Sequence, residues 1–414
     1  MSFIPSSPSA DTGFFKSGHL PTLFAAFLYF DASFMVWVIL GPLGVQIGKL
    51  LALDPAHKGL MVATPVLAGA LLRIVAGFAV DHFGAKRTGI VAQLLVIAGL
   101  ALAWRFGVPS FYAVLALGFV LGIAGASFAV ALPLASRWYP KQHQGTALGI
   151  AGAGNSGTVI ATLIVPALGL AFGVRSVFGL SALVMLPVLA AFIALAKDSP
   201  THPAPQTLAS YLKVLAIRDT WLFMLFYSVT FGGFVGLSAS LTIYFSTDYG
   251  LAPVHAGYAA AACVFAGSMV RPLGGMVADR LGGARVLSVL YLVATAMLVL
   301  VSFGLPSLAV TLGAFIVAML ALGMGNGAVF QLVPTRFGRE IGVMTGLVGM
   351  AGGIGGFYLA SSLGISKQLT GSYQGGFLIF AGLALVAFVS VRLAQRGWST
   401  GAVEARADEA AVRT

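Results

Sequence analysis

The sequence predicts an all-α membrane protein in which twelve transmembrane helices form two pseudo-symmetric halves of six. The composition is the first reason: 59% of the 414 residues are hydrophobic and only 8% are charged, whereas a soluble globular protein carries about 25% charged residues. The second reason is that the apolar residues gather into runs of about 20, the length that a membrane-spanning helix needs. The third is an internal repeat, because the stretch 71–87 returns at 269–285.

The apolar runs define the predicted spans. Strands of a membrane barrel would be about ten residues long with alternating polarity, and these runs are too long and too uniform for strands. The twelve predicted spans are 21–43, 59–80, 88–106, 111–134, 145–170, 176–195, 220–245, 256–278, 286–303, 308–333, 342–364 and 376–394. A proline-rich polar interruption divides them six and six. We therefore expect an N-terminal half at 1–195, a cytoplasmic linker at 196–219, a C-terminal half at 220–394, and a cytoplasmic, partly disordered tail at 395–414.

The distribution of lysine and arginine predicts the orientation of the spans. If both termini are cytoplasmic, sixteen of the 23 basic residues lie on the cytoplasmic side, five lie in the outer loops, and two remain inside spans. Positive charge collects on the cytoplasmic side of membrane proteins, so we expect a multi-pass protein of a bacterial inner membrane with both termini inside. The same asymmetry accounts for the formal net charge of +11, and no nucleic-acid partner is expected.

The sequence carries no pattern that is typical of an enzyme. The single cysteine, Cys263, lies in an apolar run, and the six histidines lie in or beside polar loops, so neither a disulfide nor a metal site is expected. No cluster of histidines and carboxylates, nucleophilic serine motif or phosphate-binding glycine loop is present. We expect no enzymatic activity, no metal and no cofactor.

Each copy of the repeated stretch carries an arginine inside an apolar run. Arg73 in the first copy aligns with Arg271 in the second at an offset of 198 residues. A charged side chain inside a span costs about 2.5–3.5 kcal/mol on insertion scales and is functional by default. Two equivalent arginines therefore predict one central site between two halves of the same orientation, which is an architecture of secondary transporters.

Two glycine-rich stretches and two charged turns repeat as well. The glycines are Gly145, Gly149, Gly152 and Gly154 in the first stretch and Gly346 and Gly349 in the second. Small residues let membrane helices pack closely, and a helix so rich in glycine also bends easily, so these helices serve packing, movement or both.

The charged turns contain Asp81 and Arg87 in the first half and Asp279 and Arg285 in the second. We interpret the turns as cytoplasmic latches that hold an outward-open state.

At these residues the chain resembles the major facilitator superfamily. The superfamily pattern for the loop after the second span is matched by Gly77, Asp81, Gly84, Lys86 and Arg87. His82 departs from that pattern, which has a basic side chain there. The arginine pair and the glycine stretches 145–166 and 342–360 are similar to signatures of the nitrate/nitrite porter family. The resemblance implies the major facilitator fold, alternating access, function as a monomer, and nitrate or nitrite as cargo.

Depth along the predicted spans brings seven residues to the middle of the membrane, because half of a hydrocarbon core corresponds to about ten residues of helix. They are Arg73, Arg271, Phe128, Phe231, Asn155, Tyr227 and Asp31. The arginines offer planar forks of donors that match a small oxyanion, and a single carboxylate at this depth cannot neutralise both. Either the arginines bind an anion, or they pair with backbone carbonyls for structural reasons.

The neighbours of the arginines each allow two interpretations. The resemblance implies that Phe128 and Phe231 sandwich a flat anion, although most of the 30 phenylalanines must pack helices or face lipid. Tyr227 lies one turn from Phe231, and its hydroxyl could donate to an anion oxygen. Asn155 either donates to the anion or joins helices. Asp31 either titrates, because burial favours a protonated carboxyl group, or is a fixed counter-ion.

The energetics of anion uptake complete the prediction. Importing a monovalent anion against an interior-negative potential costs about 2.3 kcal/mol per 100 mV, so uptake must be coupled to another gradient. We predict a secondary active transporter of nitrate, nitrite or both, and we favour nitrate import by proton symport, as nitrate assimilation requires. Exchange of nitrate for nitrite, and transport of another small monovalent anion such as formate, are the alternatives.

Overall fold

The computed structural model describes residues 13–199, 207–337 and 341–412, and every regular element in this part of the chain is a helix. The first half contains η1 (Phe14–Lys16), α1 (Leu20–Trp37), α2 (Gly44–Leu50), α3 (Pro55–Phe83), α4 (Ala85–Phe106), α5 (Phe111–Gly125), α6 (Phe128–Ser136), α7 (Lys141–Gly152), η2 (Ala153–Asn155), α8 (Ser156–Phe172) and α9 (Val174–Leu195). The linker contains α10 (Leu208–Leu215). The second half contains α11 (Arg218–Asp248), α12 (Pro253–Met269), α13 (Arg271–Leu281), α14 (Gly283–Ser302), α15 (Leu308–Arg336), α16 (Ile341–Thr370) and α17 (Gln374–Val412).

Twelve helical stretches in the described residues are long and apolar enough to cross a membrane, and they coincide with the twelve predicted spans. The prediction of an all-α membrane protein is therefore confirmed. The structure adds two details. The linker carries the short helix α10, and α17 extends through most of the predicted tail to Val412. No proline lies in α17, and residues 402–412 contain five alanines and two glutamates, which favour helix.

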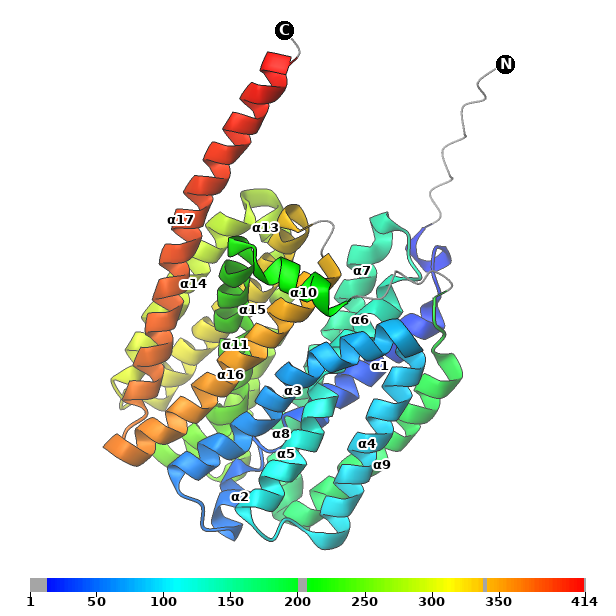
Figure 1. The fold of residues 1–414 in the computed structure, drawn as a ribbon. Coiled ribbons are helices and arrows are strands. Elements are labelled where there is room, and N and C mark those ends of the chain that lie inside the picture. The colour runs from blue at the N-terminus through cyan, green and yellow to red at the C-terminus, as the bar shows by residue number, and fades with distance from the viewer. Residues whose placement is uncertain (1–12, 200–206, 338–340, 413–414) are drawn as a thin grey trace.

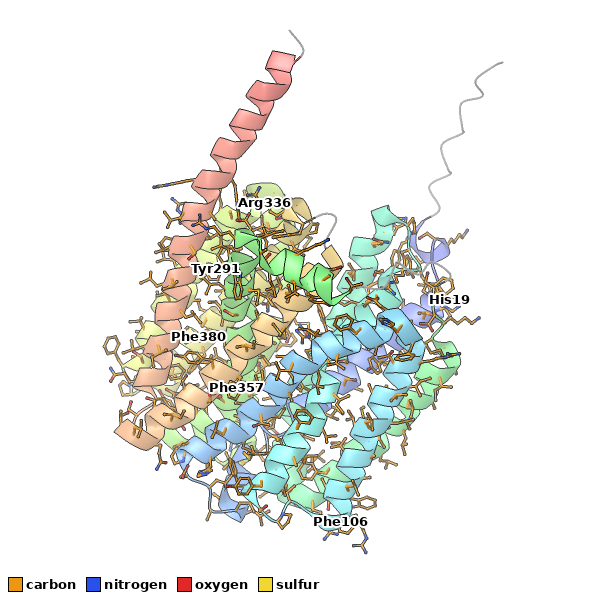
Figure 2. The ribbon with its side chains drawn as sticks, in the orientation of Figure 1. His19, Phe106, Tyr291, Arg336, Phe357 and Phe380 are labelled. Atoms are coloured by element: carbon orange, nitrogen blue, oxygen red, sulfur yellow. The ribbon has the colours of Figure 1, made fainter. Side chains whose placement is uncertain are left out.

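Figure 1 shows the first six spans in one bundle and the last six in another, with α10 lying across one end of the molecule. α1 begins and α17 ends at this same end, which we call the terminal end, and α2 lies at the opposite end. Arg336 lies at the terminal end (Figure 2). There the Asp219 carboxylate lies 3.3 Å from Arg336 and accepts a hydrogen bond from Trp398 Nε1 at 3.0 Å, so these contacts join α11, α15 and α17. Apolar side chains such as Phe106 cover the outside, as lipid contact requires.

Breaks within three spans were not predicted. They separate α5 from α6, α7 from α8 through the 3₁₀ turn η2, and α12 from α13 at Val270. At the first break, the Ala129 N–H bonds to the Ala126 carbonyl at 3.0 Å, so the Gly125 carbonyl lacks the donor that a continuous helix would supply. At the third break, Pro272 has no N–H to offer the preceding turn. Backbone groups freed inside a membrane protein need side-chain partners or a polar cavity.

The two halves are in close contact at the end opposite the terminal end, through α3 with α16 and α8 with α12. A Cβ atom on Gly364 would lie 2.5 Å from the Pro55 carbonyl oxygen and 2.8 Å from Gly59 Cα. One on Gly257 of α12 would lie 2.7 Å from Pro166 Cγ of α8. By contrast, no described atom comes within 4 Å of such a Cβ at the α7 glycines, which are Gly145, Gly149 and Gly152. The contact between the halves is therefore closed at one end of the bundle.

A leucine in place of Gly364 is expected to disfavour this closed arrangement, because the clash is with backbone atoms that no side-chain rotation can move. Overpacking of this kind costs about 1–3 kcal/mol, which corresponds to roughly a 5- to 150-fold shift between conformations. In a Cys263→Ser background, a cysteine at buried Val62 should then react faster with a membrane-impermeant maleimide. Gly382→Leu is the matched control, because nothing lies within 4 Å of a Cβ there. Equal labelling in the two variants would contradict the prediction.

Candidate functional site

Arg73 crosses the interface between the two halves. Its side chain is only 3% exposed, and its Nη1 donates to the Gly349 carbonyl of α16 at 2.6 Å. Its Nη2 donates to the Gly125 carbonyl at 3.2 Å, which is the carbonyl released by the break between α5 and α6. Two guanidinium nitrogens thus bond to backbone, while Nε is buried without a partner among the described residues.

Arg271, the equivalent residue of the second half, is differently bonded. It is the first residue of α13, directly after the break at Val270. Arg271 is partly buried, and its Nη1 is enclosed without a partner among the described residues. Neither Arg73 nor Arg271 forms an ion pair with a described carboxylate. The site therefore carries positive charge that an anion can balance.

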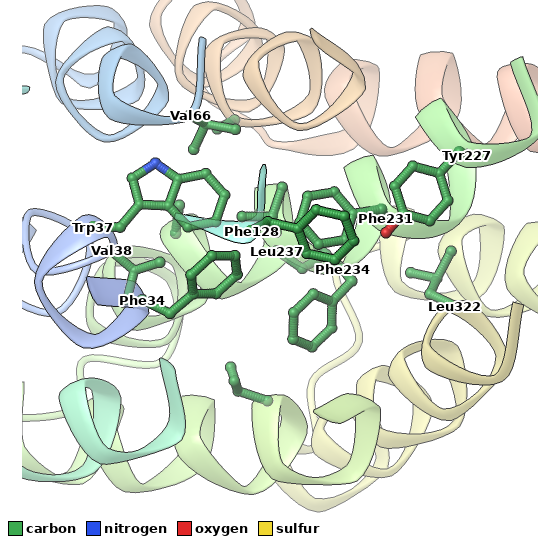
Figure 3. Packing of buried hydrophobic residues seen from close by; sticks show 14 of the residues in the cluster. Phe34, Trp37, Val38, Val66, Phe128, Tyr227, Phe231, Phe234, Leu237 and Leu322 are labelled. Atoms are coloured by element: carbon green, nitrogen blue, oxygen red, sulfur yellow. The ribbon is translucent and has the colours of Figure 1, made fainter. Parts of the chain in front are cut away.

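Aromatic rings surround the two guanidinium groups. The Arg73 Cζ lies 5.2 Å from the centroid of the Phe128 ring and 5.6 Å from that of Phe231, and the Arg271 Cζ lies 5.9 Å from the Phe128 ring. Tyr227 stacks on Phe231 with centroids 5.1 Å apart and planes 4° apart. Figure 3 shows Phe128, Phe231 and Tyr227 among the buried hydrophobic residues. In this conformation the Arg73 guanidinium lies beside both rings of the predicted sandwich.

Phe330 belongs to this cluster and was not predicted. Its ring centroid lies 5.7 Å from the Arg271 Cζ, 5.0 Å from the Tyr227 ring and 6.1 Å from the Phe128 ring. The internal repeat leads close to this residue. Pro133 and Pro334 are related by an offset of 201 residues, and the same offset leads from Phe128 to position 329, one residue before Phe330.

Asn155 lies at the joint between α7 and α8, and Asp31 of α1 packs against this joint. Asn155 is the last residue of η2, is 2% exposed, and has no described partner for its Oδ1. Asp31 Oδ1 accepts a hydrogen bond from the Ser156 hydroxyl at 2.5 Å. Asp31 forms no ion pair with either arginine in the described structure, and Ser156 is a partner that the sequence did not indicate.

The predicted latch residues lie at the ends of α3 and α13 and the starts of the helices that follow. Asp81 accepts a hydrogen bond from Arg137 Nη2 at 3.3 Å, and Arg137 belongs to the same half. Arg87, Asp279 and Arg285 form no ion pair with the residues that the structure describes. The Asp81–Arg137 ion pair joins two parts of the first half.

Three of the signature glycines lie against residues of other elements. A Cβ on Gly349 would lie 2.9 Å from Arg73 Nη1, and one on Gly154 would lie 2.9 Å from the Asp31 backbone nitrogen. One on Gly346 would lie 3.3 Å from the Tyr211 hydroxyl of α10. These glycines permit close approach at the arginine, at the acid and at the linker.

Comparison with known proteins identifies the class. A profile described as Major Facilitator Superfamily matches residues 22–360. A bacterial homologue of the human lysosomal transporter Spinster, in an inward-facing, occupied conformation, has a TM-score of 0.67 at 19% identity, covering 90% of this chain and 96% of that one. The nucleoside transporter NupG has a TM-score of 0.68 at 14% identity, with coverage of 90% and 98%. The protein is a transporter of the major facilitator fold and not an enzyme.

Comparison with individual curated proteins identifies the family within this class of transporter. The chain is 34% identical over 362 residues to a nitrite extrusion protein of Bacillus subtilis, covering 87% of this chain and 90% of the relative. It is 32% identical over 363 residues to the probable nitrate/nitrite transporter NarK2 of Mycobacterium tuberculosis, covering 86% and 91%. It is 30% identical over 410 residues to the probable nitrate/nitrite antiporter NarK1 of Thermus thermophilus, covering 91% and 92%. The chain belongs to the nitrate/nitrite porter family of the major facilitator superfamily.

Proposed function

We propose that the protein carries nitrate, and with it nitrite, across the membrane by alternating access, with the anion bound between Arg73, Arg271 and the rings beside them. The observation that carries this proposal is that arginines from opposite halves lie within 6 Å of one aromatic ring, that of Phe128, at 5.2 and 5.9 Å. The unpartnered Arg271 Nη1 is a buried donor that a planar oxyanion could accept from. The names of the relatives support nitrate and nitrite over formate.

We propose that the terminal end faces the cytoplasm, because basic residues are concentrated on the loops at that end. The close contact at Gly364 then lies on the outer side, and the conformation corresponds to an inward-facing state. In the alternate state, the charged turns around Asp81 and Asp279 would come together at the cytoplasmic side as the two halves rock.

Proton coupling is supported by the hydrogen bonds of Ser156. Its hydroxyl has one proton, yet its Oγ lies 2.5 Å from Asp31 Oδ1 and 2.8 Å from the Ala153 carbonyl oxygen, and both are acceptors when Asp31 is ionised. A protonated Asp31 satisfies both contacts, because the acid donates to Ser156 Oγ and Ser156 donates to Ala153. Loss of that proton would free one acceptor in η2, directly beside Asn155. On this basis we favour symport of nitrate with protons through Asp31.

Exchange of nitrate for nitrite is the second candidate. It is favoured by the relatives whose names include an antiporter and an extrusion protein. Asp31 would then be a fixed charge that shapes the joint between α7 and α8.

Uptake into proteoliposomes tests the proposal and separates the two candidates. Symport predicts that buffer-loaded vesicles accumulate nitrate when an inward proton gradient is imposed. Exchange predicts uptake only when the vesicles contain nitrite or nitrate. Tenfold excess formate should leave uptake unchanged, whereas nitrite should compete. Absence of nitrate uptake under both conditions would contradict the proposed function.

A further inference from the structure

A cavity lies between the two halves at the end opposite the terminal end, apart from the arginine site. It is a small, half-open recess with a volume of ≈ 40 Å³, and α3, α11 and α16 line it. The lining is mostly apolar, with Val62 and Leu363 among its residues. Lys58, near the start of α3, is the one charged side chain among the described residues that line it.

Lys58 forms no ion pair within the described structure, and two acids on the same end of the molecule have other partners. Asp54 accepts a hydrogen bond from the backbone N–H of His57 at 2.8 Å and shares one with its Nδ1 at 2.7 Å. Asp248 lies 2.7 Å from Lys367 Nζ. An unpaired cation in a mostly apolar recess creates a local positive potential.

A neutral donor also lines the cavity. Ser240 of α11 is 7% exposed, and its Oγ has no partner among the described residues. Serines inside helices usually bond to their own backbone, as Ser238 does when it donates to the Phe234 carbonyl at 2.7 Å. The Ser240 Oγ is enclosed in this closed arrangement and becomes available to a ligand when the halves separate on this side. A hydroxyl beside an ammonium group suits an anion.

The geometry of α3 connects this cavity to the arginine site. Lys58 and Arg73 are fifteen residues apart on one helix, or about 22 Å along its axis. At about 100° per residue, Lys58, Val62, Val66, Ala70 and Arg73 fall within a stripe about 120° wide. This stripe faces α16, because the α16 glycines at 356, 353 and 349 approach Val66, Ala70 and Arg73. When the halves separate on this side, the stripe becomes a wall that leads from Lys58 to Arg73.

We propose that Lys58, with Ser240, forms an outer binding site that collects small inorganic anions ahead of the central arginines. The inference rests on the proposed function and on the proposed orientation. The site is weak, since a single ammonium and one hydroxyl hold the anion loosely enough to release it inward. Its effect is on capture from the outer solution and not on the transport step.

Right-side-out and inside-out membrane vesicles test the proposal with nitrate as the probe. Lys58→Gln is expected to raise KM for nitrate about three- to tenfold in right-side-out vesicles at low ionic strength, with the maximal rate unchanged. The effect should shrink in high potassium gluconate, because salt screens the charge, and Lys58→Arg should restore KM. Lys49→Gln is the matched control, since Lys49 is an exposed lysine at the same end that does not line the cavity.

The outcomes separate this inference from the proposed function. No nitrate uptake by the unsubstituted protein overturns the proposed function and this inference with it. Normal uptake with an unchanged KM in Lys58→Gln overturns the outer site alone. A KM that rises equally from both sides, or that does not respond to salt, shows that Lys58 acts only by packing its stem against Gly48, and this also overturns the outer site.

Discussion

A lysine in place of Arg271 is expected to lower kcat/KM for nitrate about tenfold to a hundredfold. Lysine keeps the positive charge but loses the planar fork that can donate two parallel hydrogen bonds to one oxyanion. A hydrogen bond to a charged group is worth about 1.5–3 kcal/mol, and each 1.4 kcal/mol is about a tenfold change. Initial rates of nitrate uptake into proteoliposomes measure the effect.

The control lies on the same helix. Arg280→Lys makes the identical exchange at an exposed position of α13 and should leave uptake unchanged.

Arg73→Lys should reduce uptake to a similar degree as Arg271→Lys, and it should also loosen the closed contact, because it removes the bonds to Gly349 and Gly125. Labelling of a cysteine at Val62 should therefore rise with Arg73→Lys and not with Arg271→Lys. Full transport by both variants would mean that neither fork contacts the anion.

The spans could be predicted because a helix in contact with lipid must be long and apolar, and each run in the sequence has that length and composition. The breaks could not, because they depend on individual backbone hydrogen bonds, such as the one from Ala129 to Ala126. The breaks nevertheless position the candidate site. Phe128 begins α6, Asn155 ends η2, and Arg271 begins α13.

The arginines were indicated by sequence because a charge in an apolar run is conspicuous, whereas a phenylalanine in such a run is not. Phe330 was not predicted for this reason, and because the offset between the repeats varies by several residues along the chain. Ser156 was not predicted as a partner of Asp31 because this contact depends only on how the helices pack together. Gly157 has no side chain to keep α8 away from the Asp31 carbonyl, and this close approach brings the Ser156 hydroxyl to the acid.

Asp31→Asn is expected to abolish proton-driven accumulation of nitrate while preserving exchange of nitrate for nitrate. An asparagine amide can donate to Ser156 Oγ as a protonated acid does, so the joint between α7 and α8 keeps its hydrogen bonds. The side chain can no longer gain or lose a proton, so the variant should behave as a carrier fixed in its neutral form. Asp31→Glu retains a titratable group and is the variant expected to keep part of the coupling.

The size of the effect follows from the driving force. With the membrane potential clamped at zero and an inward gradient of one pH unit, symport of one proton with each nitrate accumulates nitrate about tenfold, and symport of two protons about a hundredfold, since one pH unit is worth about 1.4 kcal/mol per proton. Asp31→Asn should bring the ratio of internal to external nitrate to about one. An accumulation ratio equal to that of the unsubstituted protein would exclude Asp31 as the proton carrier. If the unsubstituted protein itself fails to accumulate nitrate yet exchanges it for internal nitrite, the transporter is an antiporter, and Asp31 acts only through the packing of the α7–α8 joint.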